Sequence, residues 1–306
     1  MDVFSALRER LAQSCPGLEL RQDEPMARHT SLRIGGPAAL MALPGSPEEA
    51  AAAVRAAHAL GVTPFFMGNG SNLLVADQGW RGFVVKAFDG LGEIRVEGTR
   101  IEAGSGVLLS RLANAALAHG LTGLEFAHGI PGSLGGAVTM DAGAYGGEMR
   151  QVVAETDCLT PTGELVTVRG EGHRFGYRTS AFSDGSRLIL RARLVLEKGD
   201  PGEIRARMDD LAARRRAKQP LEWPSAGSTF KRPEGHFAAA LIEQCGLKGA
   251  QVGGAQVSEK HAGFVINRGG ATCADMLGLM ARVRAEVFRQ TGVTLEPEVK
   301  LLGCAL

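Results

Sequence analysis

Apolar residues recur at helical spacing in several stretches of this chain, and capping residues mark the ends of those stretches. Over 2–14 the apolar residues lie four apart, on one face of an amphipathic helix. The stretch that begins at Ser46 has Glu49 three positions later, which is an S-x-x-E capping box, and it ends at Gly61, a left-handed C-cap. Further helices are predicted over 107–118, 204–219, 236–246 and 274–289, the last with Thr272 and Asp275 in capping positions.

Between these helices the apolar residues form short runs that are typical of β-strands. The run 63–77 is interrupted by a Gly-rich turn. Residues 152–168 predict a hairpin that turns at Pro161-Thr162-Gly163, and 187–199 alternate in the manner of a strand. Other strands are predicted at 82–86, 93–97, 100–103, 253–257, 262–267 and 293–303. Helices and strands mixed in this way indicate an α+β fold.

The composition changes after residue 199, where Asp-Pro-Gly-Glu opens a strongly charged helix that ends at two prolines. A domain boundary is therefore predicted there. We expect a first domain over 1–199, divided near residue 80 into two α+β subdomains, and a smaller α+β domain over 200–297. The closing segment 298–306 is a candidate to return to the first domain as a strand.

Charge and cysteine content exclude several classes of function. The 306 residues include 34 basic and 33 acidic side chains, so we expect no broad electrostatic surface for nucleic acid or an anionic membrane. The five cysteines lie far apart, which predicts reduced thiols and no metal site. The N-terminus lacks the features of a signal peptide, and no apolar run reaches the length of a membrane span, about 20 residues. We therefore expect a cytoplasmic protein.

The segment 123–147 is rich in glycine and poor in charge, since eight of its 25 residues are Gly. Glycine is favoured where a ligand comes close to the backbone. Because the residues between the glycines are apolar, we expect a buried turn that presents backbone N–H groups to a flat, apolar and phosphorylated ligand. A tightly packed turn without a ligand is the alternative.

A second Gly-rich loop, 68–72, has the sequence Gly-Asn-Gly-Ser-Asn and the composition of an anion-binding nest of backbone N–H groups. It does not match the dinucleotide fingerprint GxGxxG, because residue 73 is Leu, and no GKS or GKT motif occurs in the chain. Taken alone, the loop is equally compatible with a simple turn.

Candidate residues for chemistry lie in three short motifs, and each also has a plainer interpretation. Ser228 stands in an apolar loop, AGSTF, where it could be an ordinary turn residue. Arg178 in YRTSAF could pair with a nearby acid. Glu296 and Glu298 lie two apart, on one face of a predicted strand, so the spacing cannot choose between them.

Seven short motifs occur along most of the chain in a fixed order: HTSLRIGGPA, GNGSNLLV, GIPGSLGGAVTMDAGAYGGE, YRTSAF, PSAGSTFKRP, SEKHAGFVIN and GVTLEPEV. In this order and at this spacing they resemble one family, UDP-N-acetylenolpyruvoylglucosamine reductase (MurB), a flavoenzyme family of bacterial peptidoglycan precursor synthesis. The lack of inserted segments, and Arg232 after Lys231, resemble its shorter variety. His29 and Asp141 depart from the family, which usually has Asn at both positions; a carboxylate in place of an amide could alter a hydrogen bond or the flavin potential.

The resemblance implies an FAD-binding domain of the vanillyl-alcohol-oxidase (PCMH) type, followed by a small α+β substrate-binding domain. It implies non-covalent FAD and NADPH as co-substrate. Contacts to the FAD pyrophosphate would come from Gly68, Asn69, Gly70, Ser71 and Asn72. Contacts to the isoalloxazine and the ribityl chain would come from Gly129, Ile130, Pro131, Gly132, Ser133, Gly136 and Ala137.

By the same resemblance the substrate is UDP-N-acetylglucosamine enolpyruvate. NADPH reduces the flavin and leaves, and hydride then passes from flavin N5 to the β carbon of the enolpyruvyl group, giving UDP-N-acetylmuramate. Ser228 matches the donor of the α-carbon proton, and Arg178 and Glu298 match the residues that hold and polarise the carboxylate. Charge and position assign four residues to the diphosphate and uridine end, although two of them, four apart on a helix, also fit a solvated helix end: Arg214, Lys218, Lys231 and Lys260.

Two other interpretations stay open. One is another FAD-dependent oxidase of the same fold that acts on a sugar or a hydroxy acid; it would share the Gly-rich loops but has no reason to carry GSTFKRP and LEPEV. The other is a non-enzymatic nucleotide-sugar binder, which should lack Ser228, Arg178 and Glu298 together. We expect a monomer without nucleic-acid or membrane partners, and the sequence does not decide between NADPH and NADH.

Overall fold

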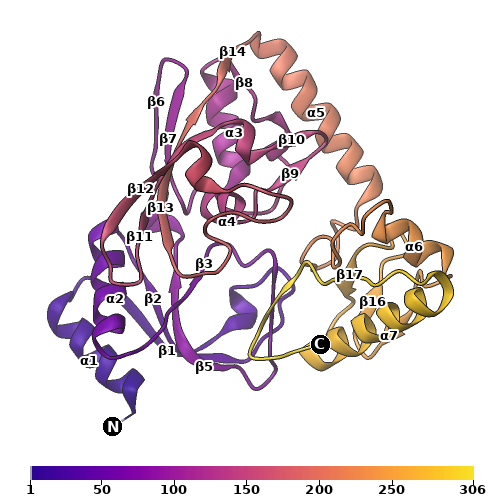
Figure 1. Ribbon diagram of the computed structural model, residues 1–306, viewed down its shortest axis with the longest axis horizontal. Coiled ribbons are helices and arrows are strands. Elements are labelled where there is room, and N and C mark those ends of the chain that lie inside the picture. The colour runs from indigo at the N-terminus through magenta and orange to yellow at the C-terminus, as the bar shows by residue number, and fades with distance from the viewer. Residues whose placement is uncertain (1) are drawn as a thin grey trace. The chain divides into compact units, whose positions relative to one another are not determined.

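The computed structural model describes residues 2–306 as a mixture of helices and sheets (Figure 1). It divides into two compact units: unit 1 comprises residues up to Asp23, Ala39–Asn69 and Gly82–Arg214, and unit 2 comprises Glu24–Ala38, Gly70–Arg81 and Arg215–Leu306. The division falls inside helix α5 (Pro201–Lys218), after the predicted boundary at 199/200. Units defined by contacts need not coincide with binding domains, so the functional domains 1–199 and 200–297 stay a prediction.

The first part of unit 1 is a four-stranded sheet that packs with two helices. Its strand order is β1-β2-β5-β3, and β3 runs parallel to β5. Leu7 and Leu11 of α1 and Val54 of α2 share one core with Leu40 and Phe83 of the sheet. The elements are α1 (Val3–Ser14), β1 (Glu19–Pro25), β2 (Pro37–Leu43), α2 (Pro47–Ala59), β3 (Phe65–Met67) and β5 (Trp80–Lys86).

The second part of unit 1 is an antiparallel sheet of order β12-β11-β13-β7-β6. Ile101 and Leu194 on one face of this sheet share a core with Leu112 of α3 and Val138 of α4. The hairpin predicted over 152–168 is confirmed as β11 and β12. The elements are β6 (Ile94–Glu97), β7 (Arg100–Gly104), α3 (Leu109–Ala118), α4 (Leu134–Thr139), β11 (Val153–Leu159), β12 (Leu165–Arg169) and β13 (Leu188–Val195).

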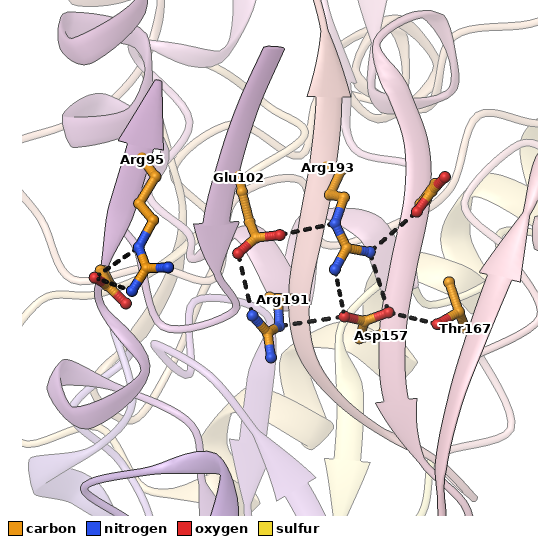
Figure 2. Close-up of polar contacts among 8 residues, drawn as sticks. Arg95, Glu102, Asp157, Thr167, Arg191 and Arg193 are labelled. Carbon is orange, nitrogen blue, oxygen red and sulfur yellow. Dashed lines mark hydrogen bonds and ion pairs between the residues drawn. The ribbon is translucent and has the colours of Figure 1, made fainter. Parts of the chain in front are cut away.

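A network of ion pairs joins neighbouring strands on the polar face of this sheet (Figure 2). Arg193 on β13 binds Glu102 on β7 (Nε–Oε2 2.7 Å) and Asp157 on β11 (Nη2–Oδ2 2.9 Å). Arg191 contacts the same two carboxylates. Burial opposes ionisation of Asp157, but hydrogen bonds from Arg193 and Thr167 outweigh it and hold the pKa of Asp157 below its usual value. Side chains therefore tie three strands together in addition to the backbone.

The Gly-rich segment 123–147 folds into short elements rather than one long turn. A 3₁₀ turn, η3, precedes α4, and a small hairpin of β9 and β10 follows it. A second small pair joins β8 to β14. The minor elements of the chain are η1 (Met26–Arg28), η2 (Asp89–Leu91), β8 (Leu121–Thr122), η3 (Glu125–Ala127), β9 (Gly143–Ala144), β10 (Gly147–Glu148), η4 (Met149–Gln151), η5 (Gly170–His173) and β14 (Glu197–Lys198).

Unit 2 contains a three-stranded antiparallel sheet, β15-β16-β17, and a separate parallel pair, β4 and β18. Leu279 and Val283 of α7 pack with Ile242 of α6 and with Val257 and Val265 of the sheet. None of the helices that the structure describes in residues 2–306 is both long and apolar enough to cross a lipid bilayer. The elements are β4 (Leu73–Val75), α6 (Ala238–Gln244), β15 (Gln251–Val252), β16 (Ala255–Val257), β17 (Val265–Asn267), α7 (Cys273–Thr291) and β18 (Lys300–Leu302).

The helix starts show how far capping rules hold. At α7 the predicted capping box is confirmed, because Thr272 and Asp275 each accept the N–H of the other. At α2 the Ser46 hydroxyl accepts the N–H of Glu49 as predicted (3.3 Å), but the Glu49 carboxylate accepts the N–H of Gly45 (2.6 Å). The capping box predicted at Ser46 is therefore only half formed, since the Glu49 side chain reaches one residue further back.

The closing strand predicted over 293–303 is wrong over most of its length. Only β18 is a strand, and it pairs in parallel with β4. Pro297 instead forms an isolated antiparallel bridge with Phe230. Proline has no N–H to donate to a ladder, which explains why the strand does not extend through this position.

Candidate functional site

Buried polar atoms without partners are concentrated in the Gly-rich loops that the sequence singles out. Residues 2–306 provide no hydrogen-bond partner for four buried side-chain atoms, which we call the unsatisfied atoms: Asn72 Oδ1, Ser105 Oγ, His128 Nδ1 and Ser133 Oγ. Leaving a buried donor or acceptor without a partner costs about 1–3 kcal/mol, so such groups in a native protein call for an explanation. A polar ligand that bonds to these atoms is one explanation.

Three of the unsatisfied atoms belong to a part of unit 1 where chain segments approach closely. The side chains of Ser105 and Ser133 are each only 1% exposed. A Cβ added at Gly135 would lie 2.8 Å from the Ser105 Cβ, and one added at Gly68 would overlap the Ser133 hydroxyl. Any side chain at these two glycines would therefore collide with a neighbouring segment, so the loops bring backbone rather than side chains to the unsatisfied hydroxyls.

The backbone of the segment 129–137 is largely occupied by internal hydrogen bonds. The N–H groups of Ile130, Gly132 and Ala137 donate to the carbonyls of Ala127, Ile130 and Ser133. These N–H groups are already engaged, contrary to the expectation that the turn offers its N–H groups to a ligand. Pro131 and Gly136 are exposed, and Ser133 is the residue of this segment that keeps an unsatisfied donor.

Asn72, the last residue of the second Gly-rich loop, is bonded to the segment that carries Glu298, and Asn72, Glu298 and Lys300 all belong to unit 2. The Asn72 amide nitrogen donates to the Glu298 carbonyl (3.1 Å), and the Asn72 carbonyl accepts the N–H of Lys300 (3.1 Å). The amide oxygen is one of the unsatisfied atoms. Residues Gly68, Asn69, Gly70 and Ser71 of the same loop are half-buried, and Gly70 has a positive φ of 64°.

Ser31 holds two further loops of unit 2 together. Its N–H donates to the Gly70 carbonyl (3.1 Å), and its hydroxyl donates to the Ser225 carbonyl (2.6 Å). The segment that carries Ser228 is thereby bonded through Ser31 to the loop that carries Asn72. Sequence reasoning did not select Ser31 as a site residue, although it lies in the motif HTSLRIGGPA.

Ser228 lies beside a rigid part of unit 2 and is itself exposed. The next residue, Thr229, is buried and fixed by three hydrogen bonds: its N–H donates to the Gly263 carbonyl, its hydroxyl accepts the N–H of Val265, and its carbonyl accepts the N–H of Glu298 (2.8 Å). The residue after it, Phe230, forms an isolated bridge with Pro297. Gly227, with φ 76°, makes the turn that presents Ser228. The geometry therefore places the accessible Ser228 hydroxyl next to a fixed backbone. The residue that follows it is hydrogen-bonded to Glu298.

The structure distinguishes Glu296 from Glu298, which the sequence spacing could not do. The Glu296 side chain is 71% exposed and pairs with Lys231 (3.3 Å). Glu298 is half-buried, and its carbonyl is the acceptor of the Asn72 amide. A carboxylate that serves a binding site is expected to be partly shielded from water, and Glu298 meets this condition better than Glu296.

Arg178 lies in unit 1, at the tip of a tight turn. Gly176 and Thr179 exchange both backbone hydrogen bonds (3.0 and 3.1 Å), which leaves Tyr177 and Arg178 between them. Arg178 has a left-handed φ of 57°, and its guanidinium lies 5.3 Å from the centre of the Tyr177 ring. A residue with a side chain in this conformation costs roughly 1–3 kcal/mol, and such strain is concentrated at functional sites.

The two departures from the resembled family each have a local polar partner. His29 is buried, and its Nε2 lies 2.8 Å from Oε1 of Glu24, which is also buried. The Asp141 side chain is 0% exposed, and Arg150 donates to it from both its backbone N–H (2.8 Å) and its Nε (2.6 Å). Asp141 also has φ 45°, a conformation that Asp and Asn both tolerate. Arg150 therefore neutralises the carboxylate that stands in place of the usual amide.

Three of the four basic residues assigned to a diphosphate already contact carboxylates. Arg214 pairs with Asp210 (2.9 Å), Lys231 with Glu296 (3.3 Å) and Lys260 with Glu222 (3.9 Å). Lys218 is exposed at the end of α5. It also acts on His261, whose pKa is lowered mainly by burial and further by the charges of Lys248 and Lys218. The four residues therefore differ: three pair with carboxylates, whereas the exposed Lys218 acts on a histidine of SEKHAGFVIN, the motif that also contains Lys260.

Flavin adenine dinucleotide suits this set of residues. Its ribityl hydroxyls can donate to an amide oxygen and can donate to or accept from a hydroxyl or an imidazole nitrogen, and its phosphate oxygens can accept from a hydroxyl, which are the kinds of atom left unsatisfied here. Glycine at 68 and 135 lets the backbone lie close to Ser133 and Ser105, because a side chain at either glycine would collide with these serines. Ser105 is an addition to the predicted set, and the Gly-Ser-Gly sequence at 104–106, between a strand and a helix, is the signal that could have identified it.

Comparisons with known proteins agree with these observations. The chain matches the model of an FAD-binding domain over residues 38–169 and that of the C-terminal domain of UDP-N-acetylenolpyruvoylglucosamine reductase over residues 219–302. Proteins of that name from Caldanaerobacter subterraneus subsp. tengcongensis and Syntrophomonas wolfei are each 48% identical to it, over 93% and 94% of this chain and 94% and 96% of theirs.

Solved structures extend the comparison to the fold. The crystal structure of the reductase from Thermus caldophilus has a TM-score of 0.80 at 34% identity and covers 93% of this chain and 98% of its own. An alkyldihydroxyacetonephosphate synthase aligns over 65% of this chain and 41% of its own with a TM-score of 0.50 at 19% identity, which concerns the fold alone. The predicted fold class, an FAD-binding domain followed by a small α+β domain, is confirmed.

Proposed function

We propose that this chain, which belongs to the UDP-N-acetylenolpyruvoylglucosamine reductase family, reduces UDP-N-acetylglucosamine enolpyruvate to UDP-N-acetylmuramate with NADPH. The observation that carries the proposal is the 48% identity over 93% of the chain to a relative of that name. We place the reaction in peptidoglycan precursor synthesis, in the cytoplasm, and expect the enzyme to act as a monomer.

Bound FAD supplies the transfer of two electrons between NADPH and the enolpyruvyl group. We assign Ser105 and Ser133 of unit 1, and Asn72 of unit 2, to the binding of FAD, because their unsatisfied atoms supply hydrogen bonds that the protein itself leaves unused. The remaining residues of the two Gly-rich loops are proposed to form the backbone that lies against FAD. No covalent bond to the protein is needed for this assignment.

Ser228 is the proposed donor of the proton that the α carbon of the substrate receives. Its hydroxyl is exposed, while Thr229 beside it is fixed by backbone and side-chain bonds. A hydroxyl is a weak acid in water, but a carbanion-like carbon is a strong base, and a fixed donor directs the proton to one face. Arg178 and Glu298 are proposed to hold the carboxylate, where negative charge develops as the double bond is reduced.

The proposed function is tested by the visible spectrum of the purified protein under anaerobic conditions. NADPH should bleach the flavin band, and UDP-N-acetylglucosamine enolpyruvate should restore it. A protein that bleaches but recovers its colour only with oxygen would instead be an oxidase of the same fold. A colourless protein that takes up no FAD would refute the assignment of the Gly-rich loops.

Three variants assign the roles within the same experiment. Ser228→Ala should bleach with NADPH at the normal rate but recover about 10²–10⁴ times more slowly with the enolpyruvyl substrate, because it removes a general acid. Glu298→Gln should slow the recovery about 10²-fold, as expected for a group that meets developing charge. Glu296→Gln is the matched control and should change little. If Glu296→Gln is the slow variant instead, the carboxylate is misassigned.

A further inference from the structure

The last carbonyl of α4 receives hydrogen bonds from two serine hydroxyls of a distant loop. Ser180 donates to the Thr139 carbonyl at 2.7 Å, and Ser183 donates to the same oxygen at 2.9 Å. A carbonyl oxygen has two lone pairs, so the two hydroxyls saturate it. Carbonyls at a helix C-terminus have no partner inside the helix, and here the partner comes from 41 residues away in sequence.

The two hydroxyls are themselves held in place by backbone N–H groups. The Ser183 hydroxyl accepts the N–H of Ser180 (2.8 Å), and the Ser180 hydroxyl accepts the N–H of Phe182 (3.2 Å). Ser180 and Phe182 are both buried. Because each hydroxyl both donates and accepts, neither can rotate without the loss of two hydrogen bonds, which makes the contact with Thr139 rigid.

This contact, which we call the Thr139 tie, joins two parts of the proposed site within unit 1. On one side, the Thr139 hydroxyl donates to the Gly135 carbonyl (2.8 Å), and the Gly135 N–H donates to the carbonyl of Ser105 (2.8 Å). A continuous path of hydrogen bonds therefore runs from a residue with an unsatisfied hydroxyl, across the Gly-rich segment, to the loop 180–183.

On the other side, the tie fixes the end of the loop that carries Arg178. The Ala181 N–H donates to the His173 carbonyl (2.7 Å), so the chain is fixed both before and after the turn Gly176–Thr179. Arg178 lies two residues before Ser180. Its left-handed φ of 57° is unfavourable for a residue with a side chain and has to be maintained by the surroundings.

We propose that Ser180 and Ser183 are positioning residues, which set the place of Arg178 relative to the Gly-rich segment through the Thr139 tie. The proposal rests on the proposed function in one respect: Arg178 is the residue that holds the substrate carboxylate. The tie itself is a statement about the loop and is testable without substrate. Reactions in which a charged group must meet its partner are sensitive to placement, and a shift of about 1 Å can cost 10²-fold in rate.

The first test measures the tie without any activity. Trypsin cleaves after Arg178 only when the turn opens, and mass spectrometry identifies the fragment that ends there. In the holoenzyme of Ser180→Ala/Ser183→Ala we expect cleavage after Arg178 at least ~10-fold faster than in the wild type, since the loop loses its bonds to α4. Ser186→Ala, which removes an exposed hydroxyl bonded to Asp184 in the same loop, is the matched control and should be cleaved as the wild type is. Equal cleavage of all three proteins would overturn the tie.

The second test separates positioning from general support of the flavin site. In the double variant, reduction of the flavin by NADPH should stay within ~2-fold of the wild type, and its re-oxidation by the enolpyruvyl substrate should slow at least ~10-fold. The single variant Ser183→Thr keeps a hydroxyl at this position and should be re-oxidised at the wild-type rate. If both half-reactions slow together, or neither does, the positioning role is wrong. If the double variant does not fold, the single variants Ser180→Ala and Ser183→Ala replace it. Each keeps one hydroxyl bonded to the Thr139 carbonyl, so re-oxidation should slow less than predicted for the double variant, but still more than flavin reduction.

Failure of the proposed function gives a different pattern. A wild-type protein whose reduced flavin is not re-oxidised by the enolpyruvyl substrate would refute the function. The trypsin measurement would still report whether the Thr139 tie holds the turn.

Discussion

Two neighbouring regions of unit 1 use buried serines in opposite ways. Ser105 and Ser133 are buried with hydroxyls that belong to the unsatisfied atoms, whereas Ser180 and Ser183 bond on both sides. A buried hydroxyl without a partner costs free energy, so a chain is expected to keep one only where a ligand supplies the missing bond. The first region is therefore expected to bind, and the second to hold the binding region in place.

Two histidines of unit 1 also differ in whether their ring nitrogens have hydrogen-bond partners. His173 is fully buried, its Nδ1 lies 3.0 Å from the Gly170 carbonyl, and its Nε2 lies 2.9 Å from the Thr156 hydroxyl. A carbonyl only accepts, so Nδ1 carries the proton and Nε2 accepts from Thr156. The Nδ1 of His128 is one of the unsatisfied atoms. By this criterion His173 belongs to the scaffold and His128 to the binding region.

The largest effect is expected where a satisfied buried charge loses its partner. Arg150→Ala removes the cation that saturates Asp141 and should lower the free energy of unfolding by about 3 kcal/mol, because a buried carboxylate is left unpaired. Chemical denaturation of the holoenzyme measures it. Arg95→Ala breaks an exposed ion pair with Glu93 and is the matched control, with an expected loss of about 0–1 kcal/mol (Figure 2).

A second variant shows whether charge is the reason. In Arg150→Ala/Asp141→Asn the buried carboxylate is replaced by the amide usual in the family, and the carboxylate that remains is that of Glu148, a half-exposed side chain that also pairs with Arg150 (2.9 Å). Most of the lost stability should return. If the double variant is as unstable as Arg150→Ala, the effect of Arg150 comes from its packing and the charge argument is wrong.

A smaller but more specific effect is expected from single serine substitutions. Ser133→Ala removes an unsatisfied hydroxyl, so the apoprotein should keep its stability, while the Kd for FAD should rise about 10-fold if the hydroxyl bonds to the cofactor. Ser180→Ala should do the reverse: it should cost about 1 kcal/mol of apoprotein stability and leave the Kd for FAD unchanged. Fluorescence titration with FAD and thermal unfolding of the apoprotein measure the two quantities. Equal behaviour of the two variants would remove the distinction between binding and holding serines.

Sequence rules predicted the parts of this molecule that depend on residues close together in the chain. The capping box at Thr272 and Asp275 and the turn between β11 and β12 form as expected, since each involves partners only a few residues apart. The Gly-rich loops stand out by their composition alone, and the structure shows why glycine is needed at 68, where a Cβ would overlap the Ser133 hydroxyl.

The rest depended on partners far away in sequence. Glu296 and Glu298 have identical spacing signals, and only the bridge between Phe230 and Pro297 places one on the surface with Lys231 and the other beside Asn72. Ser180 likewise resembles any loop serine until its bond to Thr139 is known. Short-range patterns carry no information on such pairs, so the different surroundings of these residues are seen only in the structure, and the role of Glu298 stays a prediction from the family resemblance.

The smallest expected effect concerns His173 and pH. Burial lowers the pKa of His173 below the ordinary value of about 6.5, with a weaker opposing effect from its bond to Gly170. The unfolded chain therefore binds a proton more readily than the folded one, so the stability contributed by neutral His173 is complete above about pH 6.5 and is lost as the pH falls below it.

In His173→Asn, where the amide can still donate to Gly170, the free energy of unfolding should fall less steeply between pH 7 and 5 than in the wild type. His261, whose pKa is also lowered by burial, keeps part of the slope. If the slope in His173→Asn is as steep as in the wild type, a fully bonded buried imidazole is not coupled to folding and the division between holding and binding residues does not extend to histidine.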